Sequence, residues 1–171
     1  DNAVFLFCER TKGGKRTLAL AMSEDGVSFH ISKGGVTFKT KNKKAESLSS
    51  CSNFRITKVK DIYVCLYTKK VRGIPTLYSA TSPDLFHWTA LGVFKKDHET
   101  GMIVPDYHVH GMPVMYMGGN AVSVAYSRTD AIWETADVPV IRPEKRTSRG
   151  GTNTYEVGSV WKSDDGVELV Y

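Results

Sequence analysis

One short phrase recurs three times in this chain, and it constrains the fold more than any other feature. The copies read "LAMSEDGVSF" at 20 to 29, "YSATSPDLFHW" at 78 to 88 and "VAYSRTDAIW" at 124 to 133. They keep one register, because the marking serines are separated by the same intervals as the closing aromatic residues: Ser23, Ser82 and Ser127, then Phe29, Trp88 and Trp133. A fixed register of this kind indicates a repeated structural unit.

The stretches around each phrase have the pattern of short β-strands. No run of about a dozen residues shows the three-and-four spacing of an amphipathic helix, whereas alternating apolar and polar positions are frequent. β-branched and aromatic residues, punctuated by Gly, Asp, Lys or Pro, dominate these runs. The clearest strands are expected at 54–60, 61–68, 76–82, 111–117 and 121–127. The chain is therefore predicted to be all-β.

The repeat also predicts how the strands are grouped. A strand ending in an aromatic or Met pair precedes each phrase, and a further copy, "VELVY", ends the chain at Tyr171. Four antiparallel strands in a period of roughly 40 to 50 residues are typical of a β-propeller blade. A β-sandwich also has many short strands, but it does not explain the same turn in every unit. The expected strands of the second unit are 52–60, 61–68, 73–82 and 88–94, and the approximate units are 1–45, 46–98, 99–141 and the start of a fourth at 142–171.

The phrase has a structural role in this arrangement. A short polar side chain in Ser-x-Asp can bond nearby backbone amides and fix the turn before the outermost strand. We expect the closing aromatic residue to pack between neighbouring blades, where it covers a large apolar area. The third copy departs from the pattern, because Thr129 replaces the Asp and Asp130 follows.

About three units fit between Phe7 and Tyr171, whereas closed propellers typically have four to eight blades. Three blades leave two sheet edges unpaired, and such edges invite further pairing. We therefore expect an incomplete ring within a single domain. It would be closed by homo-oligomerisation, by sequence outside this chain, or by the segment 154–161 filling the first blade.

Composition limits the class of protein. With 41% hydrophobic and 24% charged residues, the chain can bury one sizeable core, and no apolar run is long enough to span a bilayer. The first residues lack the pattern of a signal peptide, and an odd number of cysteines favours a reducing compartment such as the cytoplasm. The net charge of +5 is concentrated in "KTKNKK" at 39–44. This cluster indicates a solvated loop, and it lacks the aromatic residues on which nucleic-acid bases stack. No nucleic-acid or membrane partner is therefore expected.

Taken together, the three phrases resemble the Ser-x-Asp-x-x-x-aromatic turns of the five-bladed β-propeller glycosidase clan, which holds arabinanases, xylosidases, invertase-like fructosidases and mannoside phosphorylases. The resemblance implies a carbohydrate ligand and a glycoside hydrolase or phosphorylase activity. Two stretches are similar to the clan's innermost strands: "IVPDYHVHGMPVMYMGG" at 103–119 and "TYEVGSVWKSDDGVELVY" at 154–171. No cofactor is implied.

The resemblance assigns roles to particular residues. Glu156 matches the general acid, and Asp106 matches the Asp that stabilises the transition state or tunes the acid. Cleavage of a glycosidic bond needs a proton for the leaving oxygen and negative charge beside an oxocarbenium-like centre, so two carboxylates facing one channel suit it. The residues expected to contact the sugar are Ser52, Asn53, Tyr107, His108, Tyr155 and Trp161.

The sequence also departs from the clan. The clan places a further Asp, the base or nucleophile, on the innermost strand of the first blade, and that strand is missing from this sequence. A non-catalytic sugar-binding or interaction propeller that lacks the base is therefore an alternative. A metal site is a further hypothesis, because Asp106, His108 and His110 would share one face of a regular strand. We expect these histidines instead to be hydrogen-bonded in a polar channel without metal.

Overall fold

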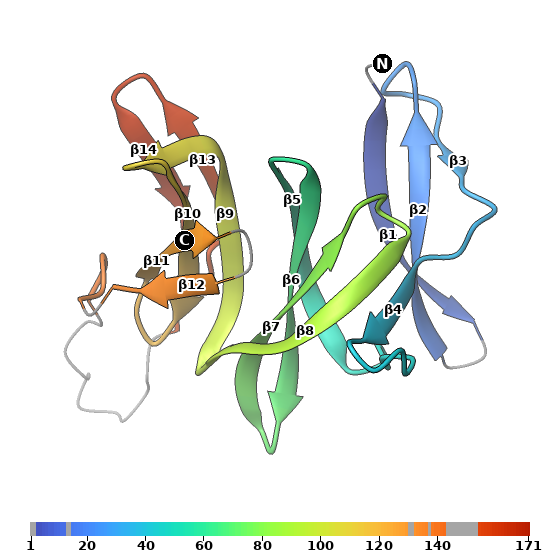
Figure 1. Cartoon of the computed structure of the whole chain (residues 1–171), viewed down its shortest axis with the longest axis horizontal. Helices are drawn as coiled ribbons and strands as arrows, with labels where there is room; N and C mark the ends of the chain where they lie inside the picture. Colours follow the sequence, from blue (N-terminus) through green and yellow to red (C-terminus); the bar gives the residue numbers. More distant parts are fainter. Residues whose placement is uncertain (1–2, 13–14, 130–131, 137, 143–153) are drawn as a thin grey trace.

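The computed structural model describes residues 3–12, 15–129, 132–136, 138–142 and 154–171. In these ranges the chain forms fourteen β-strands, and no helix has the length and hydropathy needed to cross a bilayer. The all-β prediction is confirmed. Figure 1 shows the strands gathered into separate sheets that follow one another in chain order.

Four sheets can be distinguished, and we number them by their order in the chain. The first sheet has the order β1 (Val4–Lys12), β2 (Lys15–Ser23), β3 (His30–Ile31). The second has the order β4 (Thr37–Thr40), β8 (His87–Lys96), β7 (Ile74–Ser82), β6 (Ile62–Val71), β5 (Cys51–Val59). The third has the order β12 (Ile132–Thr135), β11 (Ser123–Thr129), β10 (Met112–Gly119), β9 (His98–Val109), and the fourth pairs β13 (Ser159–Ser163) with β14 (Gly166–Val170).

Neighbouring strands are antiparallel, except for β4. In the second and third sheets the chain runs from one edge strand outward, β5 to β8 and β9 to β12, as in a propeller blade. The strand β4 adds to the outer edge of the second sheet by parallel pairing with β8. It therefore ties the segment after the first sheet to the second sheet. The predicted partial propeller is confirmed as the fold class.

The core lies between successive sheets. One buried cluster joins the first and second sheets and includes Leu20, Tyr67 and Trp88. A second cluster joins the second and third sheets, with Leu77 and Met115 among its members. The third cluster lies between the third sheet and the hairpin β13–β14. Each sheet is thus stabilised by burying apolar area against its neighbours.

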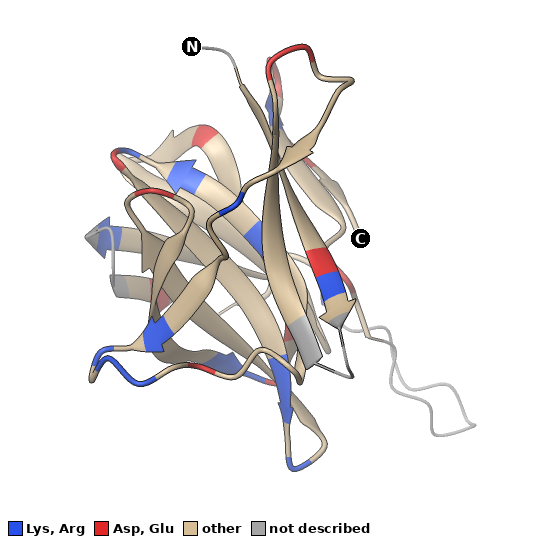
Figure 2. Ribbon diagram, turned by 90° about the vertical axis from the view of Figure 1, so that its right-hand side faces the viewer, with Lys and Arg blue, Asp and Glu red and all other residues tan. Residues whose placement is uncertain are grey.

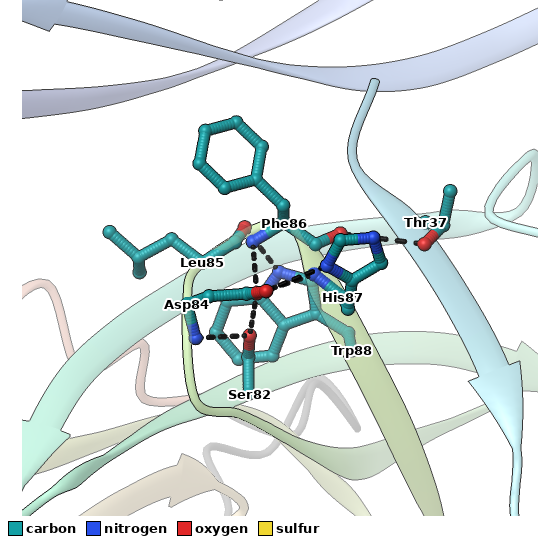
Figure 3. Close-up of polar contacts among 7 residues, drawn as sticks. All are labelled: Thr37, Ser82, Asp84, Leu85, Phe86, His87 and Trp88. Carbon is teal, nitrogen blue, oxygen red and sulfur yellow. Dashed lines mark hydrogen bonds and ion pairs between the residues drawn. The ribbon is translucent and has the colours of Figure 1, made fainter. Parts of the chain in front are cut away.

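The Ser-x-Asp phrases form the same turn in the first two sheets. In the second sheet the Ser82 hydroxyl donates to Asp84 Oδ1 at 3.1 Å, and the same oxygen accepts the backbone N–H groups of Phe86 (2.9 Å) and His87 (2.8 Å) (Figure 3). In the first sheet Ser23 donates to Asp25 Oδ1 at 2.8 Å, and that oxygen likewise accepts two backbone N–H groups. The predicted role of the phrase is confirmed at these two positions.

The closing aromatic residues follow the prediction in two copies. Trp88 is 2% exposed and stacks on Phe38 with ring centroids 5.5 Å apart, between the first and second sheets. Trp133 packs against the cluster between the second and third sheets and meets Phe94 edge-on at 6.4 Å. Phe29 differs, because 37% of it is exposed.

The difference at Phe29 has a simple geometric reason. Trp88 and Trp133 each pack toward the sheet that precedes their own in the chain. Phe29 belongs to the first sheet, and no described sheet precedes it. In the third copy the register of β11 and β12 shifts between Ser127 and Thr129, and Asp130 lies outside the described residues.

The first sheet has no innermost strand among the described residues, since β1 pairs there only with β2. The idea that segment 154–161 fills this place within one chain is wrong. That segment instead leads into β13, which pairs with β14 and packs beside β9 of the third sheet.

Candidate functional site

Side-chain hydrogen bonds from β5 and β6 of the second sheet reach the beginning of β9. Asn53 Nδ2 donates to the backbone carbonyl of Glu99 at 3.2 Å, and the Thr68 hydroxyl donates to the same carbonyl. Asn53 has φ of 54° and lies in a β-bulge, where Asn53 and Phe54 together face Tyr67. Asn tolerates this left-handed backbone better than most residues, so the sequence fits the bulge.

The segment before β13 is held against the third sheet on both sides of Glu156. The Tyr155 N–H donates to the Gly119 carbonyl at 2.7 Å, and the Val157 N–H donates to Thr100 Oγ1 at 2.8 Å. Val157 is buried, whereas the Glu156 side chain is exposed. The backbone of Glu156 is therefore fixed while its carboxylate is free to meet a ligand.

Gly118 makes this close approach possible. A Cβ atom built on Gly118 would lie 2.3 Å from the Tyr155 carbonyl oxygen and 2.7 Å from Thr100 Oγ1. Any larger residue would have to displace backbone. The glycine pair in "YMGG" is therefore needed to position Glu156, in addition to ending β10.

Glu99 is a carboxylate that the sequence analysis missed. It is half-buried, immediately precedes Thr100, and lies at the start of β9, as Asn53 lies near the start of β5. The hydrogen bond between Thr100 and Val157 sets the backbones of the residues that precede them, Glu99 and Glu156, at the same level, while the Glu99 side chain points to the other face of β9 from Thr100. The signal that could have found it is its place just before the stretch 103–119, which resembles an innermost strand. We call Asn53, Glu99, Thr100 and Glu156 the inner-strand site.

The structure places Asp106 away from this site. It lies further along β9, in a wide bulge where 104–107 face Val114, and it is exposed with φ of 53°. Thr100 pairs with Gly118, and the bulge that contains Asp106 faces Val114, so Asp106 lies about four residues, or roughly 13 Å, along the sheet from Thr100. Tyr107 and His108 follow Asp106 on the same strand. Tyr107 is half-buried against the third core cluster, and His108 is exposed. The catalytic role of Asp106 stays a prediction.

Of the other residues expected to contact the sugar, Ser52 and Tyr155 are next to residues of the inner-strand site, and Trp161 is further away. Ser52 is next to Asn53 and half-buried at the start of β5. Tyr155 lies beside Glu156, with its ring 5.8 Å from that of Tyr171 and its hydroxyl donating to the Arg142 carbonyl at 3.4 Å. Trp161 is 42% exposed on β13 and offers an aromatic surface further along.

No three His, Cys, Asp or Glu side chains come together as metal ligands in the described ranges. The alternation argument for Asp106, His108 and His110 fails for a backbone reason. Asp106 lies in the bulge and His110 in the following turn, with φ of 53° and 51°, so the three residues do not belong to one regular strand. The metal hypothesis is therefore not supported.

Solved structures share this fold. A glycosyl hydrolase from Bacteroides ovatus matches with a TM-score of 0.70 at 23% identity, over 98% of this chain and 55% of its own. A putative glycosidase from Bacteroides thetaiotaomicron matches with 0.69 at 25% identity, over 98% of this chain and 57% of its own. No family model matches the chain, and no curated protein sequence matches it significantly.

Two further neighbours share the fold. One, matching with a TM-score of 0.69 at 22% identity over 98% of this chain and 55% of its own, is described among GH130 mannoside phosphorylases and hydrolases that target β-1,2 mannosidic linkages. Another, a GH32 β-fructofuranosidase from Bombyx mori in complex with sucrose, matches with 0.53 at 16% identity over 86% of this chain and 38% of its own. The chain spans a little over half the length of the first neighbours. It therefore has the fold of part of a five-bladed β-propeller glycosidase.

Proposed function

We propose that this chain carries part of a carbohydrate-cleaving site, in which Glu156 protonates the leaving oxygen of a glycosidic bond. The observation that carries the proposal is the fixing of Glu156 between two backbone hydrogen bonds while its side chain stays exposed. A general acid must be held within reach of one substrate atom, and a backbone anchored on both sides restricts where the carboxyl can go.

A second carboxylate is needed beside the reacting carbon, to stabilise positive charge or to direct the attacking water or phosphate. Glu99 is placed for this role, because it begins the neighbouring inner strand at the level of Glu156. Asp106 was the expected partner, and it lies further along β9. We therefore assign the role of the second carboxylate to Glu99. Asp106 remains the alternative candidate for this role.

The neighbours in the solved structures support carbohydrate chemistry, because they are described as glycoside hydrolases, a mannoside phosphorylase family and a fructofuranosidase. Asn53 supplies an amide at the same end of the inner strands, of the kind that binds sugar hydroxyls. Whether water or phosphate accepts the sugar is part of the test below.

A second candidate is a sugar-binding propeller without catalysis. The position of Asp106 favours this view, because the carboxylate that the resemblance assigns beside the general acid lies in the bulge further along β9. The inner-strand site alone would then bind a sugar without cleaving it.

The test is turnover of a panel of aryl glycosides and sucrose, with and without inorganic phosphate. Glu156→Gln is expected to lower kcat/KM at least 100-fold, the usual contribution of a positioned general acid. Glu99→Gln should lower it by a similar factor. Glu168→Gln on the exposed strand β14 is the matched control and should leave turnover unchanged. Full activity of Glu156→Gln would exclude Glu156 from the mechanism, and a wild-type chain that binds sugars without cleaving them would support the second candidate.

A backbone variant tests the positioning itself. Gly118→Ala inserts a methyl group into the contact with Tyr155 and Thr100, so it should lower kcat more than it raises KM. Gly35→Ala is the control, since nothing lies within 4 Å of its added Cβ. Equal kinetics for both variants would show that the Gly118 contact does not position Glu156.

A further inference from the structure

A second polar pocket lies on the other face of the second sheet. Its volume is about 250 Å³, and its polar lining comes from Thr40, Lys41, Asn42, Glu46, Tyr67 and Tyr78. Tyr67 and Thr68 are consecutive on β6, so their side chains point to opposite faces. Thr68 reaches Glu99 of the inner-strand site, whereas Tyr67 packs toward the first sheet. The pocket is thus separate from the inner-strand site.

Two hydroxyl groups of this pocket are buried without a partner in the described part of the chain. Tyr67 is completely buried, and neither its Oη nor Thr40 Oγ1 has a hydrogen-bond partner there. A buried hydroxyl group that stays unsatisfied destabilises the fold, because its hydrogen bonds to water are lost without replacement. Burial raises the pKa of Tyr67, so its hydroxyl keeps its proton and can donate. These two groups need a ligand or water that both accepts and donates.

The pocket walls are fixed in advance. The turn that carries Lys41 and Asn42 is closed by hydrogen bonds from Lys43 N to the Thr40 carbonyl and from Thr40 N to the Lys44 carbonyl, both 2.8 Å. Glu46 is held by its N–H on the Phe38 carbonyl at 2.8 Å and by an ion pair with Lys69. The backbone of the walls is therefore held in place, and a ligand has to displace only side chains to reach the two buried hydroxyl groups.

Tyr78 provides an aromatic wall. Lys69 Nζ lies 4.9 Å from the centre of the Tyr78 ring and 5.7 Å from that of Tyr67, and Glu46 neutralises it. The ion pair holds both rings in place and leaves the charge of Glu46 largely compensated. The pocket thus combines aromatic surface with hydroxyl, amide and carboxylate groups.

This lining selects the chemical class of ligand. The mixture of donors and acceptors matches a molecule rich in hydroxyl groups, whereas an inorganic anion supplies mainly acceptors and would pair chiefly with Lys41. The volume falls below the range of about 300–1,000 Å³ typical of drug-sized ligands, so it suits one ring. We propose that this pocket binds a single sugar ring, whose hydroxyl groups pair with Tyr67 Oη and Thr40 Oγ1. The site would hold a sugar away from the inner-strand site, and it does not depend on catalysis by Glu156.

The experiment is a backbone-amide NMR titration of the full chain with D-mannose, D-glucose, D-fructose and inorganic phosphate as separate probes. At least one sugar is expected to shift the amide signals of Thr40, Asn42 and Tyr67 in a saturable way. Tyr67→Phe removes only the hydroxyl and should weaken that binding at least 10-fold, and Thr40→Val should do the same. Tyr63→Phe on the same strand is the matched control and should bind like the wild type.

Each other outcome is decisive. Sugar shifts confined to Glu99, Thr100 and Val157 would overturn this proposal and leave the inner-strand site intact. Shifts at the pocket from phosphate alone, or from no probe, would also overturn it. Unweakened binding in Tyr67→Phe would show that the hydroxyl takes no part. Glu156→Gln should not alter binding here, so failure of the proposed catalysis and failure of this pocket can be told apart.

Discussion

The turns of the first and second sheets are alike in their hydrogen bonds and unlike in their surroundings. Asp25 and Asp84 each hold two backbone N–H groups two and three residues ahead. Yet the aromatic residue that closes the turn is only 2% exposed at Trp88 and 37% exposed at Phe29. The turn is thus a local property of its residues, whereas burial of the aromatic side chain depends on a neighbouring sheet.

The residue that follows the Asp also differs between the two turns in its burial. Gly26 has φ of 74° and Leu85 has φ of 69°, so both adopt the left-handed conformation. Glycine adopts it freely, whereas a leucine is strained by roughly 1–2 kcal/mol. Leu85 is 4% exposed and belongs to the core cluster between the first and second sheets. Burial there outweighs the strain, and at Gly26 no such burial is available.

The largest expected effect compares the two aromatic residues. Trp88→Ala should lower the free energy of unfolding by about 3–5 kcal/mol, because it removes a fully buried ring. Phe29→Ala should lower it by less than about 1 kcal/mol, as is usual for exposed positions. Urea unfolding followed by circular dichroism measures both. Similar losses for the two variants would mean that Phe29 is covered in solution, for example by a second copy of the chain.

The next comparison separates strain from burial. Leu85→Ala should cost about 2–4 kcal/mol, since it empties a core position while keeping the left-handed backbone strained. Leu85→Gly should be more stable than Leu85→Ala by about 1 kcal/mol, because glycine relieves that strain. Gly26→Ala should cost about 1 kcal/mol, with its added Cβ only in ordinary contact with Val4. If Leu85→Gly were the less stable of the two, strain at Leu85 would be absent.

The smallest effect is a dependence of stability on pH. Backbone hydrogen bonds, from Ser28 and Val27 to Asp25 and above all from His87 to Asp84, hold the pKa of each carboxyl well below its usual range. A lowered pKa in the folded state stabilises the protein above the ordinary carboxyl pKa of about 4, and this contribution is lost as the pH falls further. Both groups are exposed, so the effect is small.

Urea unfolding between pH 2.5 and 6 measures this dependence. Asp84→Asn should flatten the decline below pH 4, and Asp25→Asn should flatten it as well, because both carboxylates accept two backbone N–H groups; Asp84 also pairs with the His87 ring at 2.7 Å. A decline as steep as that of the wild type in both variants would show that these two carboxylates do not account for it.

The repeat predicted the fold because its information is local. The predicted strands of the second unit nearly coincide with β5 to β8, since alternation and turn residues act over a few positions. The parallel pairing of β4 with β8 was not predicted, because it joins residues distant in sequence. The exposure of Phe29 was missed for the same reason: the turn pattern carries no information about the neighbouring sheet.

The site was predicted less well than the fold. The roles of Glu156 and Asn53 stay predictions, and their backbones are held by hydrogen bonds near the start of β9. Asp106 was expected in the same channel because it and Glu156 lie on successive units, and the bulge in β9 sets it further along the strand. Glu99 carried no motif of its own, so only the hydrogen bonds of its neighbours reveal it. Bulges and backbone contacts of this kind have no simple pattern in one sequence.

The addition of β4 to the second sheet has a consequence for the order of synthesis. Thr37 to Thr40 leave the ribosome well before their partners His87 to Ala90. The segment that follows the first sheet therefore has to wait unpaired until the whole second sheet has been translated. During that interval Phe38 has neither Trp88 nor Tyr67 to cover it, and this nascent stretch would be a natural target for a chaperone.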